Sequence, residues 1–176
     1  IPNACNFKGA GGPDETMGRR RGFRKKGRVF GTLDEIAEKR AWLGPLHPVK
    51  LHQMGEPMLH PDLPEIVAHA ERKGVGIELN TNCSLLTEEL VDGLYDAGLT
   101  NFILSYQTPD RESFKTRKAK NKKLTFDIYL EKVRMAVERK VAKKARTHLE
   151  IDVMNTSGSP GIRIVAQLKW WSRISP

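Results

Sequence analysis

Between positions 49 and 108 the pattern of apolar and polar residues switches repeatedly between the period of a strand and that of a helix. Residues 49–54 alternate apolar and polar side chains, as a half-buried strand does. Leu63, Ile66, Val67 and Ala70 then recur at the spacing of one apolar helix stripe. The same succession follows twice more and predicts strands at 49–54, 75–80 and 101–105, with helices between them.

Capping residues and glycines mark where these helices begin and end. Asp62, with Glu65 three positions later, has the pattern of a capping box, and Thr87 is placed to cap the following helix. Gly74 and Gly98 come where the two helices should stop, because a glycine in the left-handed region commonly ends a helix. The sequence therefore predicts helices that start directly after Asp62 and Thr87.

The region before the first strand is less regular. Residues 1–28 are rich in glycine and basic side chains, show no sustained period, and predict a loop. Thr32 and Glu35 form a second candidate capping box, which predicts a helix over 33–43. Regular alternation would place another strand ahead of the loop, and its absence favours a fragment whose first strand is missing.

The carboxyl-terminal third continues the alternation and then becomes ambiguous. A helix is expected over 126–140 and a strand over 149–153, where apolar residues alternate with acidic ones. Residues 162–171 are apolar and fit either another strand or an irregular terminus. We expect a core domain at 1–155 and an uncertain tail at 156–176.

Each of the three central strands ends on a short polar triplet. The triplets begin at Gly55, Asn80 and Ser105, which are 25 residues apart. One parallel strand, its helix and two short loops occupy about that length. Consecutive right-handed crossovers place such strands side by side, so their carboxyl ends share one edge of the sheet, where α/β folds bind ligands. The triplets therefore predict one binding site: Gly55-Glu56-Pro57, Asn80-Thr81-Asn82 and Ser105-Tyr106-Gln107.

Length and composition narrow the class of protein. A chain of 176 residues fits one domain with a real core, or part of a larger one. No apolar run approaches the length of a membrane-spanning helix, and nothing at the start resembles a signal peptide. The first residue is Ile1 rather than methionine, which again favours a fragment. Two cysteines give no disulfide framework and indicate a reducing cytoplasm.

The net charge of +9 comes from three basic clusters. Such clusters can bind the phosphate backbone of a nucleic acid or an acidic substrate. They also fit solvated loops and helix faces, and they lack the interleaved aromatic residues that favour single-strand binding. Both interpretations stay open, with solvated faces preferred. The clusters lie at 19–28, 115–123 and 139–146.

Three stretches resemble the radical S-adenosylmethionine (radical SAM) enzymes. Residues 55–63 look like the GEP-L-x-H-P-D-L stretch of that family, and residues 80–87 resemble its next strand end, usually T-N-G. Cys5-Asn6-Phe7-Lys8 is similar to the start of the family's cluster-binding loop. The resemblance covers roughly residues 3 to 155 and implies a truncated, incomplete parallel (β/α) barrel, which is an α/β fold.

The resemblance also implies the cofactors. In these enzymes three cysteines of a C-x-x-x-C-x-x-C loop hold a four-iron four-sulfur (4Fe-4S) cluster, and S-adenosylmethionine binds the fourth iron. The cluster then cleaves the cofactor to a 5′-deoxyadenosyl radical, while the protein orients it and excludes water. The backbone of the GEP strand end would meet the amino group of the cofactor, and later strand ends its ribose or carboxylate. The expected cofactor-binding residues are Gly55, Glu56, Pro57, Asn80, Asn82 and Ser105.

The partners implied by the resemblance are a small-molecule or peptide substrate and, in an active enzyme, an electron donor such as a flavodoxin or ferredoxin. A radical enzyme domain is therefore the first functional hypothesis. The second is a non-catalytic module that binds RNA or another anion through the basic surface. The strand-end triplets favour the first.

The chain departs from the family pattern at the cluster loop. Cys5 occupies the first ligand position that the resemblance implies, but Gly9 and Gly12 occupy the other two expected ligand positions. Glycine has no side chain to bind iron, and thiolates are the usual ligands of these clusters. Cys83, on another loop, is more consistent with an ordinary packed thiol. We expect this chain to be deficient in the cluster.

Three residues keep a structural alternative beside the functional one. His52 either points toward the barrel interior or is a hydrogen-bonded structural histidine. Glu56 could act as an acid or base, although in the family it mainly fixes the strand end. Asn82 could contact the cofactor or simply satisfy a turn.

Overall fold

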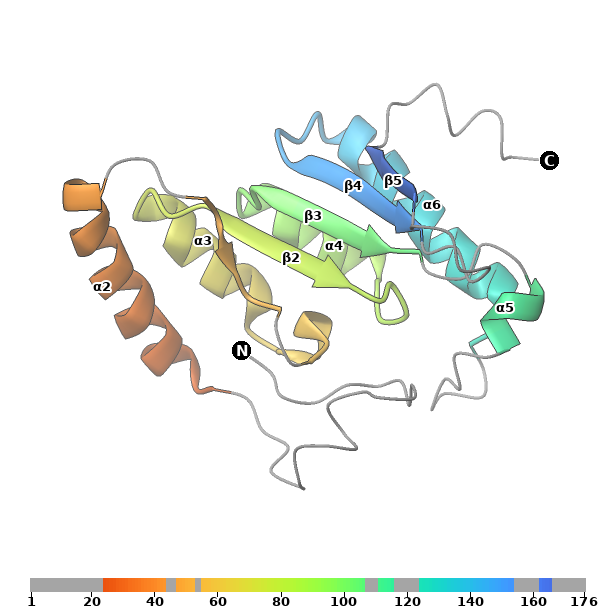
Figure 1. Cartoon of the computed structure of the whole chain (residues 1–176), viewed down its shortest axis with the longest axis horizontal. Helices are drawn as coiled ribbons and strands as arrows, with labels where there is room; N and C mark the ends of the chain where they lie inside the picture. The colour runs from red at the N-terminus through yellow and green to blue at the C-terminus, as the bar shows by residue number, and fades with distance from the viewer. Residues whose placement is uncertain are drawn as a thin grey trace.

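The computed structural model describes residues 24–43, 47–52, 55–106, 111–115, 124–153 and 162–165. Strands and helices alternate through most of this range, as expected for an α/β fold (Figure 1). In chain order the elements are α2 (Lys26–Leu43), β1 (Val49–Lys50), η1 (Pro57–Leu59), α3 (Leu63–Arg72), β2 (Ile77–Thr81), α4 (Glu88–Asp96), β3 (Asn101–Ser105), α5 (Arg111–Lys115), α6 (Phe126–Ala142), β4 (His148–Val153) and β5 (Ile162–Val165).

The strands form one sheet in the order β1-β2-β3-β4-β5. The first four are parallel, as predicted, and their neighbours follow one another in sequence. The fifth strand is antiparallel to β4, an orientation that the sequence did not predict. Because β1 to β4 run the same way, their carboxyl ends lie along one edge of the sheet. We call this edge the carboxyl edge.

Helices α3, α4 and α6 lie on one face of the sheet (Figure 1). The side chains between them form the main apolar core, which includes Ile66 of α3, Leu94 of α4 and Phe102 of β3, each 0% exposed. Burying a side chain of this size contributes about 1.5–3 kcal/mol. The core therefore fixes the strands and, with them, the position of the carboxyl edge.

The other face of the sheet is polar. Lys50, Glu78, Asn101 and His148 occupy matching register positions on four successive strands. Asn101 donates a hydrogen bond to Glu78 across the sheet at 3.1 Å, so these side chains share a face. Ile103, on the same face two residues after Asn101, is buried but lies outside the main apolar core. We call this the open face, because helices α3, α4 and α6 lie on the opposite one.

Most predicted boundaries are confirmed within a few residues. The strand at 101–105 matches β3, and Thr87 caps α4 by accepting a hydrogen bond from the Leu90 backbone N–H at 3.2 Å. Gly74 and Gly98 have φ values of +67° and +83°, the conformation expected where these helices end. The second strand begins at Ile77 rather than at residue 75, because the Val75 N–H bonds the Ala70 carbonyl and completes the end of α3.

The ends of the sequence-predicted elements differ in three further places. The helix expected over 126–140 runs from Phe126 to Ala142, and β1 ends at Lys50 instead of continuing to residue 54. The Leu51 N–H still donates to the Glu78 carbonyl at 3.1 Å, so backbone hydrogen bonding to β2 continues one residue beyond the end of β1. Of residues 162–171, the structure describes Ile162–Val165, which form β5. The division between a core at 1–155 and a tail stays a prediction.

The capping box predicted at Thr32 and Glu35 is wrong. Helix α2 begins at Lys26, and Thr32 lies inside it with its hydroxyl donating to the Arg28 carbonyl at 3.1 Å. Val29 is buried one turn before Leu33, so the apolar stripe starts earlier than the glycine-rich sequence suggested. The packing of this stripe outweighs the low helix propensity of the preceding residues.

The capping box predicted at Asp62 and Glu65 is also wrong, although α3 does begin directly after Asp62. The Asp62 side chain makes no cap hydrogen bond, and its backbone N–H donates to Nδ1 of His60 at 3.1 Å. Lys26 lies 2.6 Å from Glu65 and 3.7 Å from Asp62. Both carboxylates therefore join the start of α2 to the start of α3 instead of capping α3.

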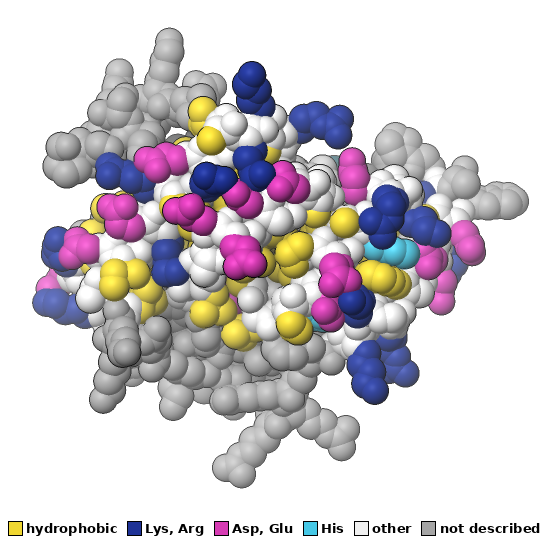
Figure 2. Space-filling model, turned by 180° about the vertical axis from the view of Figure 1, so that it is seen from behind, with side chains coloured by type: hydrophobic (Ala, Val, Ile, Leu, Met, Phe, Trp, Pro, Cys, Tyr) yellow, Lys and Arg dark blue, Asp and Glu magenta, His cyan; other side chains and the backbone are white. Residues whose placement is uncertain are grey.

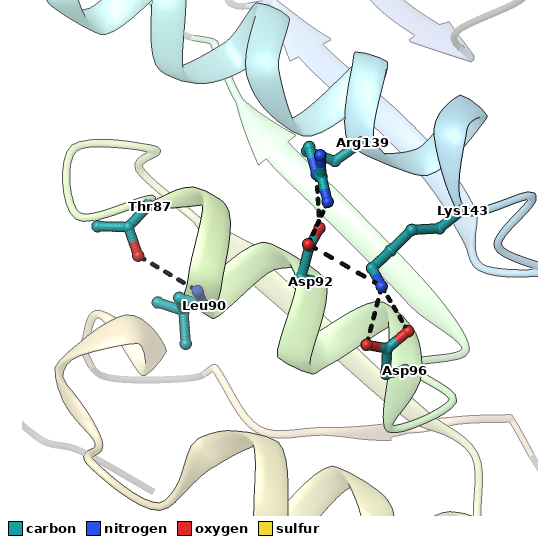
Figure 3. A network of polar contacts seen from close by, with 6 residues as sticks. All are labelled: Thr87, Leu90, Asp92, Asp96, Arg139 and Lys143. Carbon is teal, nitrogen blue, oxygen red and sulfur yellow. Dashed lines mark hydrogen bonds and ion pairs between the residues drawn. The ribbon is translucent and has the colours of Figure 1, made fainter.

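An ion-pair network joins α6 to α4 (Figure 3). Arg139 of α6 makes a two-pronged contact with Asp92 of α4, with Nε 2.7 Å from Oδ1 and a second bond to Oδ2. Lys143, one turn later, lies 2.8 Å from Asp96 and 3.9 Å from Asp92. The hydrogen bond from Arg139 holds the pKa of Asp92 below its ordinary value.

This lowered pKa predicts how stability depends on pH. The pair stabilises the fold above the pKa of Asp92 in the unfolded chain, and the contribution is lost as pH falls through the lower folded-state pKa. The substitution Arg139→Gln should lower the melting temperature at neutral pH, and the difference should shrink as pH falls through the range where carboxyl groups titrate. Melting curves recorded across that range measure it. The control is Arg134→Gln, which removes the same charge from a residue paired with Glu131 on α6 itself; a difference that stays constant with pH would contradict the prediction.

Candidate functional site

Glu56 connects the first two strand-end triplets. Its carboxylate accepts hydrogen bonds from the Met58 N–H at 3.1 Å, the Thr81 hydroxyl at 2.7 Å and the Asn82 N–H at 2.9 Å. The residue is 3% exposed. Glu56 therefore fastens the segment after β1 to the end of β2, which is the structural role that the sequence left open beside an acid–base role.

Asn80 and Ser105 connect the second triplet to the third. The Ser105 hydroxyl donates to Oδ1 of Asn80 at 2.8 Å, although the two residues are 25 positions apart in the chain. The Nδ2 group of Asn80 donates no hydrogen bond within the described part of the chain, so it is available to a ligand at the carboxyl edge. The prediction that the triplets meet at one edge is confirmed for their described residues.

The remaining residues of the predicted site frame this edge. Gly55 is half-buried directly before Glu56, and Pro57 is buried as the first residue of the short helix η1. Gln107 of the third triplet lies outside the described residues. That Gly55, Glu56, Pro57 and the asparagines bind a cofactor stays a prediction.

Asn82 shapes the turn after β2. Its Oδ1 accepts from the Ser84 N–H at 3.1 Å and from the Ser84 hydroxyl at 2.6 Å. Cys83, between them, has a φ of +65°, and its thiol is fully buried with Sγ 3.6 Å from the Thr81 carbonyl. The turn interpretation of Asn82 is therefore confirmed, and Cys83 is a packed thiol, as the sequence favoured.

An aromatic cluster supports the end of β3. The Tyr129 hydroxyl of α6 donates to the Ser105 carbonyl at 2.9 Å, and its ring stacks on Tyr106 with centroids 5.3 Å apart. Phe114 of α5 also contacts Tyr129 at a centroid distance of 5.3 Å. Sequence reasoning missed this support, although Tyr129 lies three residues after Phe126 and four before Val133, which is the spacing of one helix stripe.

His52 lies on the open face beside Glu78. Its Nδ1 is 3.3 Å from the Glu78 carbonyl, and its Nε2 is 3.8 Å from the Glu78 carboxylate. Burial lowers the pKa of His52 below the usual histidine value. Burial alone would raise the pKa of Glu78, but a hydrogen bond from Asn101 and the charge of Lys50 reverse this and lower it. The interpretation of His52 as a hydrogen-bonded histidine is therefore confirmed, and its direction toward the barrel interior stays a prediction.

Two other described histidines, His60 and His69, have structural partners. His60 is buried, with Nε2 3.0 Å from the Arg24 carbonyl. His69 contacts Asp34 at 3.0 Å and stacks on Phe30. Among the described residues no three His, Cys, Asp or Glu side chains lie close enough together to hold a metal ion.

The residues of this chain do not fit a 4Fe-4S cluster. Cys5, Gly9 and Gly12 lie outside the described residues. The number of cysteines in the chain nevertheless decides whether a cluster can be held. The whole chain has two cysteines, and one of them, Cys83, is buried and bonded to its own turn. One remaining thiolate is too few for a cluster that needs three.

Several residues of the basic clusters form ion pairs where the structure describes them. Lys26 of the first cluster contacts α3, and Arg139 and Lys143 of the third contact α4. Figure 2 shows acidic and basic side chains interspersed over the helical side of the molecule. This distribution favours solvated helix faces over a phosphate-binding surface. No helix in the described ranges is long and apolar enough to cross a membrane.

A family model described as the Radical SAM superfamily matches residues 5–157. Curated relatives match over shorter segments. A GTP 3′,8-cyclase from Chlorobaculum tepidum is 41% identical over 61 residues, which is 34% of this chain and 18% of that protein. A PqqA peptide cyclase from Granulibacter bethesdensis is 37% identical over 82 residues, or 46% of this chain and 20% of that protein. The matched segments thus span about a fifth of the curated relatives.

Two solved structures share the fold. BtrN in complex with AdoMet and 2-DOIA has a TM-score of 0.51 at 20% identity, covering 74% of this chain and 51% of that chain. TYW1 with a lysine-pyruvate adduct bound has a TM-score of 0.50 at 15% identity, covering 88% of this chain and 62% of that one. These likenesses confirm the predicted fold class, an α/β fold of the radical SAM type with an incomplete barrel.

Proposed function

This chain belongs to the radical SAM superfamily, and from that membership we propose that the carboxyl edge of its sheet binds S-adenosylmethionine. The observation that carries the proposal is the contact between Asn80 and Ser105, which places an amide and a hydroxyl from adjacent strand ends together. The Nδ2 of Asn80 can donate to a carboxylate or ribose oxygen, and the Ser105 hydroxyl can accept from a ribose hydroxyl. BtrN, which shares the fold, is described in complex with AdoMet.

Glu56 holds this edge in shape instead of contacting the cofactor with its own carboxylate. The three hydrogen bonds that it accepts fix the segment after β1 beside the end of β2. The backbone at Gly55 and Glu56 is then presented at the edge and is expected to meet the amino group of the cofactor. A fixed edge of this kind orients a ligand without a further ordering cost.

We propose that this chain does not assemble the 4Fe-4S cluster and does not cleave S-adenosylmethionine. The thiolates that the cluster requires are missing at Gly9 and Gly12. By descent the fold served radical chemistry on a small-molecule or peptide substrate. The electron donor would be a protein such as a flavodoxin or ferredoxin, and the location would be the cytoplasm. Those partners and that location are proposals that follow from the family.

Removing Asn80 or Ser105 should weaken cofactor binding. Asn80→Ala and Ser105→Ala should each raise the Kd for S-adenosylmethionine about 3- to 10-fold, because each deletes a hydrogen bond worth about 0.5–1.5 kcal/mol. Calorimetric titration of the metal-free protein measures this. His148→Ala is the matched control, since His148 begins β4 at the opposite end of the strands and should leave Kd unchanged. Equal affinities for all four proteins, or no measurable binding by the parent, would overturn the proposal.

A further inference from the structure

We propose that His52 and Glu78 form a receptor for a protonated primary amine of the substrate, on the open face of the sheet. The recognition of an amine rests on the geometry and charge of these residues, whereas its being part of a substrate rests on the proposed function. Glu78 lies two residues before Asn80 on β2, and the site uses side chains that do not belong to the triplets.

One oxygen of the Glu78 carboxylate is hydrogen-bonded to Asn101, and the other lies beside both Lys50 and His52. Asn101 donates to its Oε2 at 3.1 Å, which fixes the orientation of the group. Its Oε1 faces Nε2 of His52 at 3.8 Å, a separation too long for a hydrogen bond. The Glu78 side chain is 11% exposed and the His52 side chain 17% exposed, so both are largely shielded from water.

His52 presents an acceptor to the same space. Its Nδ1 lies 3.3 Å from the Glu78 carbonyl, and a carbonyl oxygen only accepts, so Nδ1 carries the proton. Burial lowers the pKa of His52 and favours the neutral ring, which leaves Nε2 as a bare acceptor. Nε2 of His52 and Oε1 of Glu78 thus lie side by side as acceptors, and the Lys50 ammonium, 3.3 Å from Oε1, is the donor that the described residues place beside them. A group with several N–H donors and a positive charge complements that arrangement best, and a primary ammonium has both.

Lys50 shows that an ammonium fits beside this carboxylate. Its Nζ lies 3.3 Å from Oε1 of Glu78, on the same face and in the adjacent strand. Its side chain is 66% exposed, so little packing holds it there and a ligand amine can displace it. Lys50 is therefore an internal competitor for the site.

The receptor is close enough to the carboxyl edge to bind another part of the same ligand. Glu78 precedes Asn80 by two residues on one strand, so both side chains point to the same face. Two residues of a strand span about 7 Å. A substrate whose amine sits between His52 and Glu78 would extend its next few atoms toward Asn80 and Ser105.

The test uses n-propylammonium chloride as the probe and long-range proton–nitrogen correlation spectra of the metal-free protein as the readout. The probe should shift the His52 Nε2 resonance saturably, whereas sodium propionate at equal ionic strength should not. Glu78→Gln should raise the Kd of the probe at least tenfold. Lys50→Met should lower the Kd of the probe about threefold or more, because the competing ammonium is removed. A merely structural role of Lys50 would not produce this effect.

Lys115→Met is the matched control for charge, because it removes one exposed lysine on α5, paired there with Glu112. It should leave the affinity for the probe unchanged. A saturable response to propionate instead of the amine, or unchanged affinity in Lys50→Met, would overturn the inference even if Glu78→Gln failed to fold. The amine titration contains no S-adenosylmethionine. A failure of cofactor binding at Asn80 and Ser105 would therefore appear only in the separate cofactor titration.

Discussion

Replacing Glu56 with alanine should lower the free energy of unfolding by about 3–5 kcal/mol. The substitution leaves three donors, on Met58, Thr81 and Asn82, without the acceptor that they share in a site 3% exposed. Each buried unsatisfied donor costs about 1–3 kcal/mol, partly recovered if water enters. Domains of this kind are stable by about 5–15 kcal/mol, so the loss would be a large share of the total.

Urea unfolding followed by far-ultraviolet circular dichroism measures this loss. Glu56→Gln keeps one acceptor oxygen and should recover part of the stability. Glu65→Ala is the matched control, because it also removes a glutamate but one that is exposed and paired only with Lys26 among the contacts described. Equal unfolding free energies for Glu56→Ala and Glu65→Ala would show that Glu56 does not hold the carboxyl edge.

Restoring the two missing thiolates should convert the chain from a protein without a cluster to one with a cluster. Gly9→Cys together with Gly12→Cys completes the C-x-x-x-C-x-x-C spacing that begins at Cys5. Thiolates are the ligands that hold such clusters, so the double variant should take up about four irons per chain with the brown absorbance of thiolate-bound iron. The unmodified chain, reconstituted anaerobically beside it, should retain almost none.

Controls separate the ligands from the loop. Gly9→Cys alone should bind far less iron than the double variant, and adding Cys5→Ser to the double variant should abolish binding. About four irons in the unmodified chain would implicate Cys83 or a group other than cysteine. A double variant without iron would show that the loop itself is misplaced.

The fold was predictable because its signals are local. The succession of strand and helix periods, with Gly74 and Gly98 at helix ends, fixed the α/β order without any long-range information. Thr87 was correctly predicted as a cap, whereas Thr32 and Asp62 carry the same local pattern and do not cap. The difference lies in tertiary packing: the Val29–Leu33 stripe carries α2 past Thr32, and Lys26 attracts Asp62.

The site was predictable in position but not in detail. The 25-residue spacing of the triplets correctly brought Asn80 and Ser105 together, because parallel strands align their carboxyl ends. Which side chain would bind which neighbour depended on register between strands. His52 and Glu78 are 26 positions apart in the chain, and Tyr129 and Ser105 are 24 positions apart. No local sequence pattern predicts either contact.

The central claim is that S-adenosylmethionine binds this chain at the carboxyl edge of the sheet, and backbone amide chemical shifts test it most directly. Titrating the cofactor into isotope-labelled, metal-free protein should shift amides at Gly55, Asn82 and Ser105, at the ends of the strands. The amides of Ile77 and His148, at the beginnings of strands β2 and β4, should stay unchanged. Shifts confined to the beginnings of the strands or to the basic helices, or no shifts at millimolar cofactor, would contradict the claim.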